Sequence, residues 1–212
     1  MSARDEVLGR IRAALGSGGV VEEVPRSYRG AGAGPAPGDP EVVDRFCERA
    51  AEYRATVRRV PAAGLPEAIA AAFAEHGARR VAVAPDVPAA AGAALELVGD
   101  DPPLSARDLD ALDGVLTGCA AAIAETGTIV LDGGPRSGRR MLSLVPDLHV
   151  CVVDVADVHA SVPDAIAALA GAAAEGRPLT FVSGPSATSD IELERVEGVH
   201  GPRTLVILVA GP

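Results

Sequence analysis

The sequence predicts an α/β fold, a three-layer helix-sheet-helix sandwich around a mostly parallel sheet. From residue 41 onward, short apolar runs rich in β-branched residues alternate with alanine-rich segments of helical periodicity. Right-handed crossovers between such strands place helices on both faces of a parallel sheet. With 212 residues, 48% of them hydrophobic, the chain can bury a sizeable core as one domain.

Residues 1–40 are predicted to form an N-terminal arm ahead of the α/β domain at residues 41–212. The arm begins with a short amphipathic helix at residues 2–15, for which Ser2 and Asp5 provide a capping box. A stretch rich in glycine and proline follows, which forms no packed element of its own. The helix must bury its apolar face on its own domain or on a neighbouring subunit, and the second arrangement would create a homo-oligomer.

Within the domain, strands are predicted at residues 56–60, 80–84, 95–98, 129–131, 149–154, 178–182 and 204–209. Helices are predicted at residues 41–54, 65–75, 86–94, 136–144 and 163–175, with a further short one that begins at residue 105. The almost wholly apolar run at 149–154 is typical of an interior strand. Ligands of such sheets collect beyond the carboxyl ends of the strands, so we expect functional residues on strand-to-helix loops.

Composition narrows the classes of partner. A net charge of -10 disfavours nucleic acid and anionic membranes, and the low aromatic content of 2% leaves no base-stacking platform. Small molecules and proteins are the expected partners. Cys47, Cys119 and Cys151 form no CxxC pair, so we expect no metal or iron-sulfur site in this chain. The charged N-terminus is unlike a signal peptide and no apolar run is long enough to span a membrane, which predicts a cytoplasmic protein.

A polar tetrad, Glu125, Thr126, Gly127 and Thr128, interrupts two apolar runs at the point where a buried sheet gives way to a turn. In one interpretation the threonines pair within a tight turn, the glycine takes a positive φ and the glutamate faces solvent. In the other, the glycine lets a ligand approach the backbone, the hydroxyls bind it, and Glu125 acts as a base or nucleophile.

A second constellation follows the predicted strand at 178–182. This loop contains Ser183, Gly184, Ser186, Thr188 and Asp190. Hydroxyls and glycine amides in such an arrangement can hold a carboxylate or phosphate, especially where a helix begins. A hydroxyl-rich surface turn that caps a helix explains the same residues.

Further candidates are His200 and Arg203, just before the last strand, and Arg139 and Arg140 in the predicted helix at 136–144. Histidine titrates near neutral pH, and arginine recognises carboxylates with two parallel hydrogen bonds. A turn histidine and surface ion pairs are the alternatives. No HxxxH or HxH pattern is present, so a metal site is not expected.

Taken together, several segments resemble the lactate utilization protein C family, whose core is the LUD domain. They are TGCAAAIAETGTIVLDGG, RRMLSLVPDLHVCVVD, SGPSATSDIELERVEGVHGPRTL and the charged N-terminal helix with its VPRSY arm. The resemblance implies a three-layer fold akin to the NagB, ribose-5-phosphate isomerase and CoA-transferase group. It also implies a role in bacterial L-lactate oxidation to pyruvate, with the iron-sulfur clusters in partner subunits. One departure is that family members often have a histidine in the closing strand, where residues 204–209 have none.

Three hypotheses follow. In the first, the chain is a lactate-oxidising subunit in which Glu125 or His200 is the base, and Arg203, Arg139 or Arg140 holds the substrate carboxylate. In the second, Glu125 acts in a CoA-transferase-like reaction, or the site isomerises a sugar phosphate. In the third, the chain is a non-catalytic assembly or regulatory subunit that uses its arm as the contact.

Overall fold

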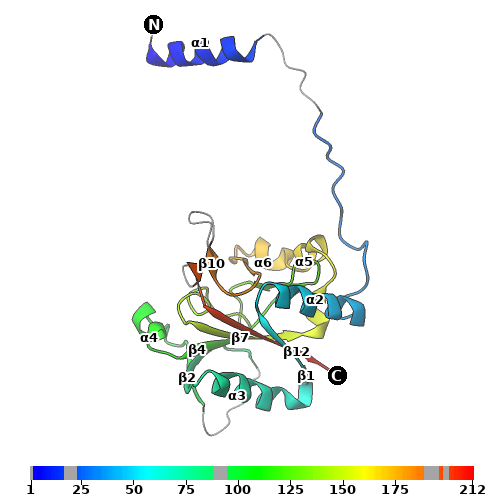
Figure 1. The fold of residues 1–212 in the computed structure, drawn as a ribbon, viewed down its shortest axis with the longest axis vertical. Helices are drawn as coiled ribbons and strands as arrows, with labels where there is room; N and C mark the ends of the chain where they lie inside the picture. Colours follow the sequence, from blue (N-terminus) through cyan, green and yellow to red (C-terminus); the bar gives the residue numbers. More distant parts are fainter. Residues whose placement is uncertain (1, 17–22, 88–94, 189–195, 198–200) are drawn as a thin grey trace.

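The computed structural model describes residues 2–16, 23–87, 95–188, 196–197 and 201–212. Its centre is a six-stranded sheet (Figure 1). In spatial order the strands are β1 (Thr56–Pro61), β12 (Thr204–Gly211), β7 (Leu148–Asp154), β4 (Gly114–Gly118), β2 (Arg80–Val83) and β3 (Glu96–Gly99). Every neighbouring pair is parallel, which confirms the predicted parallel sheet.

A second, smaller sheet lies beside the first. Its spatial order is β8 (Val158–His159), β5 (Ala121–Ile123), β6 (Thr128–Leu131) and β9 (Thr180–Val182), and β6 is antiparallel to both of its neighbours. The sequence predicts β6 and β9 as strands but not their departure from the central sheet. The turn between β5 and β6 explains the departure, because so short a connection can join only antiparallel strands. A further antiparallel pair consists of β10 (Ala187–Thr188) and β11 (Val196–Glu197).

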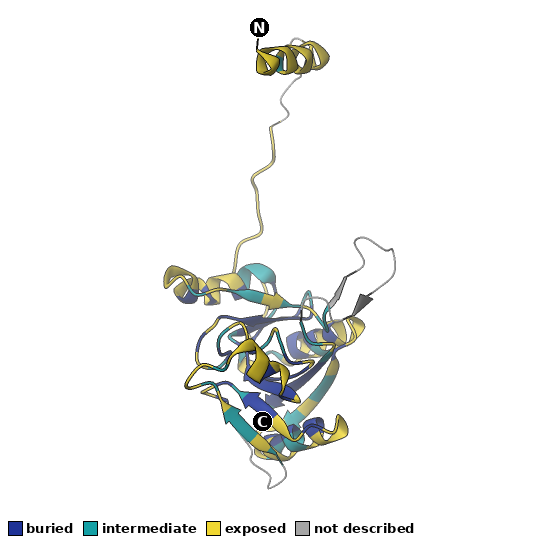
Figure 2. Cartoon of the chain, turned by 90° about the vertical axis from the view of Figure 1, so that its left-hand side faces the viewer, coloured by how far each residue is buried: buried dark blue, intermediate teal, exposed yellow. Residues whose placement is uncertain are grey.

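Helices cover the central sheet as predicted. One face packs against α3 (Leu65–Glu75), whose Ile69 and Phe73 are fully buried. The other face packs against α2 (Pro40–Glu52) and the inner side of the second sheet, with Phe46 of α2 fully buried. The outer side of the second sheet is covered by α5 (Val162–Ala168), which is followed by α6 (Ala170–Ala174). Figure 2 shows the buried residues concentrated in the sheets.

The local helix signals have mixed outcomes. The helix predicted from residue 105 is α4 (Ala106–Asp110), with a capping box between Ser105 and Asp108. The helix predicted at 163–175 is divided between α5 and α6. Of the helix predicted at 86–94, residues 88–94 lie outside the described part of the chain.

The helix predicted at 136–144 is wrong, because this segment forms a series of turns. Gly138 has a φ of +66°, which interrupts a right-handed helix. The Asp132 carboxylate accepts hydrogen bonds from the Gly134 amide at 3.0 Å and the Ser137 hydroxyl at 3.1 Å, and these fix the turn. Arg139 and Arg140 therefore lie on a loop that can direct their side chains to different places.

The N-terminal helix α1 (Ala3–Leu15) has the predicted capping box and no buried residue, and it stands apart from the α/β domain (Figure 1). The later part of the arm contacts the domain: the Gly32 amide donates to Asp164 at 2.7 Å, and the Gly38 amide donates to the Val158 carbonyl at 3.1 Å. None of the described helices is long and apolar enough to cross a membrane.

Candidate functional site

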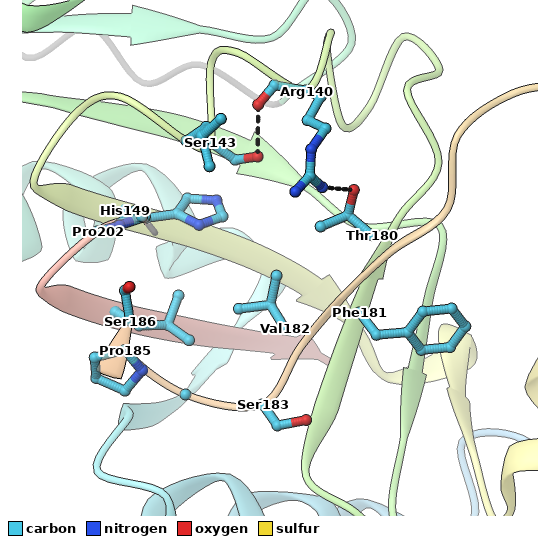
Figure 3. A pocket seen from close by; sticks show the side chains of 14 residues that line it. Arg140, Ser143, His149, Thr180, Phe181, Val182, Ser183, Pro185, Ser186 and Pro202 are labelled. Carbon is cyan, nitrogen blue, oxygen red and sulfur yellow. Dashed lines mark hydrogen bonds between the residues drawn. The ribbon is translucent and has the colours of Figure 1, made fainter. Parts of the chain in front are cut away.

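A cavity of about 290 Å³ opens where the amino ends of β7 and β12 meet the carboxyl end of β9. Small-molecule sites typically occupy roughly 300–1,000 Å³, so this cavity suits a small ligand. Its polar lining comprises Arg140, Ser143, His149, Thr180, Ser183 and Ser186 (Figure 3). The cavity therefore lies at the amino-terminal end of the parallel strands, whereas the sequence led us to expect ligands at the carboxyl-terminal end.

Arg140 is the cation of this cavity. Its guanidinium donates a hydrogen bond to the Thr180 hydroxyl at 2.5 Å, and its carbonyl accepts one from Ser143 at 3.3 Å. Arg140 forms no ion pair with any described residue, and no carboxylate from that part of the chain lines the cavity. An exposed guanidinium among neutral hydroxyls favours an anionic ligand over a cationic one.

The imidazole of His149 forms the inner wall. His149 is only 1% exposed, and its Nε2 lies 2.7 Å from the hydroxyl of Thr117 on β4, which is itself fully buried. Nδ1 forms no hydrogen bond with a described residue. The ring therefore has its Nε2 engaged with the core, and the residue forms part of the cavity wall.

A row of hydroxyls reaches the cavity from the turn between β5 and β6. The hydroxyls of Thr126 and Thr128 lie 2.7 Å apart, and that of Thr128 lies 2.6 Å from the Ser183 hydroxyl. The threonines pair within the turn, as the structural interpretation of the tetrad has it, and Thr128 also contacts a residue that lines the cavity. Thr126 and Thr128 themselves are not among the lining residues.

The loop after β9 depends on Gly184. Its φ is +108°, and a Cβ at this position would lie 3.0 Å from the Cβ of Tyr53 and still closer to the Tyr53 carbonyl oxygen. Two residues on, the Ser186 amide donates to the Pro202 carbonyl at 2.8 Å, which ties the loop to the segment before β12. Glycine is thus required here by the close approach of the chain end of α2, and the loop forms one side of the cavity.

Glu125 does not line this cavity. Its two carboxylate oxygens each accept a hydrogen bond from the Arg29 guanidinium at 2.8 Å, and Oε1 also accepts one from the Val162 amide at 3.4 Å. Gly127 has a φ of +62°, and a Cβ there would lie 2.8 Å from the Cα of Ala50, so it serves the packing of the turn against α2.

The remaining candidates are divided between other places. Arg203 pairs with the carboxylate of Asp147 on the surface, and this guanidinium lowers the pKa of Asp147. Thr188 belongs to β10, and nothing is described of its side chain. Asp190 and His200 lie outside the described residues, so their assignment to a site stays a prediction.

A second hollow, of about 530 Å³, lies at the expected carboxyl ends of β2 and β3. Its arginine is already neutralised. Arg139 donates to both oxygens of Asp100, at 2.5 Å and 2.8 Å, and also to the Leu104 carbonyl. Burial alone would raise the pKa of Asp100, but the hydrogen bonds from Arg139 and the Leu104 amide lower it. Because Arg139 is already paired with Asp100, we expect this hollow to bind an anionic ligand less well than the first cavity.

The three cysteines are free thiols, and Cys119 and Cys151 are fully buried beside each other in the core. Within the described part of the chain, no group of three or more His, Cys, Asp or Glu side chains is placed to hold a metal ion.

Of the residues nominated from the sequence, Arg140, Ser183, Gly184 and Ser186 line the cavity, and His149, which was not nominated, lines it too. The only signal available was a histidine at the second position of a strand that is otherwise apolar, HVCVVD. A polar side chain in a buried strand needs a partner, and that fact alone could have selected it. Its partner Thr117, 32 positions earlier, gives no signal of its own.

Comparisons with known proteins agree on one family. A model of the LUD domain matches residues 104–210. The chain is 51% identical over 172 residues to a protein of Deinococcus radiodurans named "Lactate utilization protein C", which covers 81% of this chain and 80% of that protein. A Bacillus mycoides protein named "Lactate utilization protein C 1" is 37% identical over 92 residues, which is 41% of this chain and 39% of that protein.

A crystal structure of a DUF162 family protein from Deinococcus radiodurans has the same fold. It superposes with a TM-score of 0.71 at 44% sequence identity and covers 81% of this chain and 97% of that one. With this agreement of fold, domain match and sequence identity, the chain belongs to the LUD domain family.

Proposed function

We propose that this chain is a subunit of a bacterial lactate utilization system and that the cavity beside Arg140 and His149 binds the carboxylate of L-lactate or pyruvate. The observation that carries the proposal is the chemistry of the cavity: an arginine without an acidic partner among the described residues, together with a buried imidazole and several hydroxyls. Support for the pathway comes from the relative of 51% identity that is named "Lactate utilization protein C".

Each part of a small 2-hydroxy acid has a suitable group in the cavity. The Arg140 guanidinium can hold the carboxylate with two parallel hydrogen bonds, and Ser183 and Thr180 can donate further ones. Leu144 and Phe181 provide an apolar wall for the methyl group. Nδ1 of His149, which forms no hydrogen bond with a described residue, is suited to accept the proton of the hydroxyl as it becomes a carbonyl.

The reaction proposed is the oxidation of L-lactate to pyruvate, in which the O–H and C2–H bonds break. His149 takes the hydroxyl proton, and the C2 proton and the two electrons leave to the iron-sulfur partner subunits. This chain is assigned substrate binding and proton transfer, and no cofactor of its own. The assay is L-lactate-dependent reduction of an artificial electron acceptor by the partner subunits, with and without this chain. Activity that requires this chain and is lost in His149→Asn supports the proposal, whereas full activity without the chain refutes it.

Binding can be tested separately by calorimetry with pyruvate and L-lactate. Arg140→Gln should weaken carboxylate binding at least about tenfold, since a hydrogen bond to a charged group contributes roughly 1.5–3 kcal/mol. Arg203→Gln is the matched control, because Arg203 is paired with Asp147 away from the cavity. Lactamide, which lacks the negative charge, should bind poorly to every variant. If the two arginine variants bind pyruvate with equal affinity, the cavity is not the carboxylate site.

The structure favours a second candidate, an assembly role for the arm. Val7, Ile11 and Leu15 of α1 are 55%, 49% and 74% exposed, and a 13-residue helix without packing is only marginally stable in water. Deletion of residues 1–16 should then abolish binding to partner subunits and leave binding of pyruvate unchanged. Retained partner binding would count against an assembly role.

A further inference from the structure

Thr117 on β4 is the hydrogen-bond partner of His149 behind the wall of the cavity. Its hydroxyl oxygen lies 2.7 Å from Nε2 of the imidazole, and the imidazole itself belongs to a residue that lines the cavity (Figure 3). Thr117 is fully buried and His149 is 1% exposed, so water does not compete for this hydrogen bond. The orientation of the ring is therefore set from inside the protein.

The register of two parallel strands brings the pair together. β7 is aligned with β4 so that His149 is level with Val115, and Thr117 is level with Cys151. Side chains two residues apart on a strand point to the same face of the sheet, so the Thr117 hydroxyl and the imidazole share one face. The imidazole is long enough to reach diagonally to the neighbouring strand.

A polar pair at this place is not needed for the stability of the fold. Apart from the pair and the Cys151 thiol, the buried residues of β4 and β7, both described in full, have no polar side chain. Replacing both partners of a buried hydrogen bond by apolar groups of the same shape is nearly neutral for stability. The presence of His149 is thus better explained by the cavity that it lines, and that of Thr117 by the need of a buried imidazole for a partner.

The direction of this hydrogen bond decides what Nδ1 of His149 can do. A neutral imidazole has one N–H donor and one acceptor nitrogen. If Nε2 donates to the Thr117 oxygen, Nδ1 keeps a free lone pair. If the Thr117 hydroxyl donates to Nε2 instead, Nδ1 carries the ring proton and cannot take another. Only the first arrangement makes Nδ1 a base toward a ligand hydroxyl.

We propose that Thr117 is a positioning residue, whose oxygen accepts the Nε2 proton of His149 and so holds the ring as the tautomer with a basic Nδ1. The role in catalysis rests on the proposed function, whereas the tautomer is a property of the free protein. Thr117 is not among the residues that line the cavity, so it acts through His149.

The proton transfer conserves atoms and charge. The O–H bond of the ligand breaks and an N–H bond forms at Nδ1, which leaves an imidazolium with a proton on each nitrogen. The Thr117 oxygen accepts from Nε2 before and after this step, so the core does not rearrange. Because a charged donor forms a stronger hydrogen bond, the same contact stabilises the imidazolium more than the neutral ring. The C2 proton and the two electrons leave to the partner subunits, as under the proposed function.

Ring-nitrogen NMR of the full chain tests the tautomer without any ligand. The protonated and the bare nitrogen of a neutral imidazole have well-separated nitrogen chemical shifts, and the His149 signals are the ones that His149→Asn lacks. The spectrum is recorded above the pH at which these signals stop changing, where the ring is neutral. We expect the proton on Nε2 in the parent protein. A proton on Nδ1 would overturn the proposal.

Substitution of Thr117 tests the cause of the tautomer. Thr117→Val keeps the shape of the side chain and removes the hydroxyl, so the ring should lose its preference for the Nε2 proton, whereas Thr117→Ser should retain it. Thr128→Val is the matched control, because it removes another buried strand hydroxyl, one that contacts Ser183, and should leave the His149 tautomer unchanged. A Thr117→Val protein with the parent tautomer would show that Thr117 only fills space. If Thr117→Val does not fold, the parent spectrum decides.

The lactate assay with the partner subunits adds a readout that a purely structural role would not move. Thr117→Val should lower kcat about 10–100-fold, the range seen when a residue that orients a metal-bound histidine is removed. The KM for L-lactate should stay unchanged, since Arg140 still holds the carboxylate. Thr117→Ser should recover most of kcat. An equal loss in both variants, or a change in KM alone, would contradict the positioning role.

Failure of this inference and failure of the proposed function are distinguishable. The NMR spectrum uses no ligand, and calorimetry with pyruvate tests the site through Arg140 alone. A protein that binds pyruvate but carries its His149 proton on Nδ1 keeps the site and refutes the role of Thr117. A protein that binds no pyruvate but has the Nε2 proton, lost in Thr117→Val, upholds the control of the tautomer by Thr117 and refutes the proposed ligand.

Discussion

Arg29 of the N-terminal arm donates to both carboxylate oxygens of Glu125, at 2.8 Å each, across 96 positions of sequence. The Glu125 side chain is 26% exposed, so the pair is partly shielded from solvent. The pairing gives Glu125 a structural task, which is to hold the arm against the turn between β5 and β6. A carboxylate already occupied by a guanidinium is a poor nucleophile until that partner leaves.

Glu125→Gln should therefore release the arm and leave carboxylate binding unchanged. Tryptic cleavage after Arg29 should be faster in this variant, because the guanidinium is no longer held. Glu52→Gln is the control, since it removes another arginine-paired glutamate, on α2, that does not contact the arm. Loss of lactate-dependent activity in Glu125→Gln with the arm still protected would instead return Glu125 to the chemistry.

Substitution of Gly127 and of Gly77 compares two physical reasons for a glycine, which are its backbone conformation and the close approach of another segment. Both have a positive φ, of +62° and +69°, but a Cβ at Gly127 would collide with the α2 backbone while a Cβ at Gly77 would meet nothing within 4 Å. Gly77→Ala should cost about 1–2 kcal/mol from the backbone conformation alone. Gly127→Ala should cost a further ~1–3 kcal/mol, because α2 must shift. Urea denaturation measures both, and similar losses would show that α2 adapts freely.

The features that the sequence revealed are those set by neighbouring residues. The capping boxes at Ser2 and Ser105 depend on a residue three positions away, and both are present. The alternation of strands and helices likewise predicts the parallel sheet. The turns at 136–144 were mistaken for a helix because the side-chain bonds of Asp132 and the positive φ of Gly138 outweigh helical periodicity.

Features that depend on pairing between residues far apart in the sequence could not be predicted from local patterns. The second sheet requires β6 to pair with β9, about fifty positions later, and no local pattern distinguishes that from a place in the central sheet. The composition of the loop after β9 nominated Ser183 and Ser186, and both line the cavity. His149 was not nominated because its hydrogen-bond partner, Thr117, lies on another strand. Arg139, Arg140 and Arg203 were nominated together, but the fold decides which of them has a carboxylate nearby.

Arg139 and Arg140 are adjacent in sequence, but their substitution should change the stability of the fold by different amounts. Arg139→Gln strands the carboxylate of Asp100, whose side chain is only 9% exposed, so it should lower the free energy of unfolding by about 1–3 kcal/mol. Arg140→Gln removes one hydrogen bond at the surface and should change it by less than about 0.5 kcal/mol. The measurement is the urea midpoint of each variant. Equal losses would contradict the division of roles between these two residues.

Asp113 provides a pH-dependent test of the loop before β4. Its carboxylate accepts hydrogen bonds from the amides of Arg79 and Arg80 at 2.7 Å and 2.9 Å. These bonds, that of Arg80 foremost, lower the pKa of Asp113 below its ordinary 3.8. Because the folded state binds this proton less readily than the unfolded state, the stabilisation is complete above pH 3.8 and is lost as the pH falls through the lowered value.

Asp113→Asn should therefore destabilise the protein at neutral pH by about 1 kcal/mol, a small effect because the carboxylate is exposed and screened. The difference in unfolding free energy between the parent protein and this variant should shrink toward zero as the pH is lowered below 3.8. Asp110→Asn, at an exposed aspartate of α4 with no hydrogen bond to a described residue, should show neither effect. A difference that stays constant with pH would mean that the shape of the side chain, and not its charge, secures the two amides.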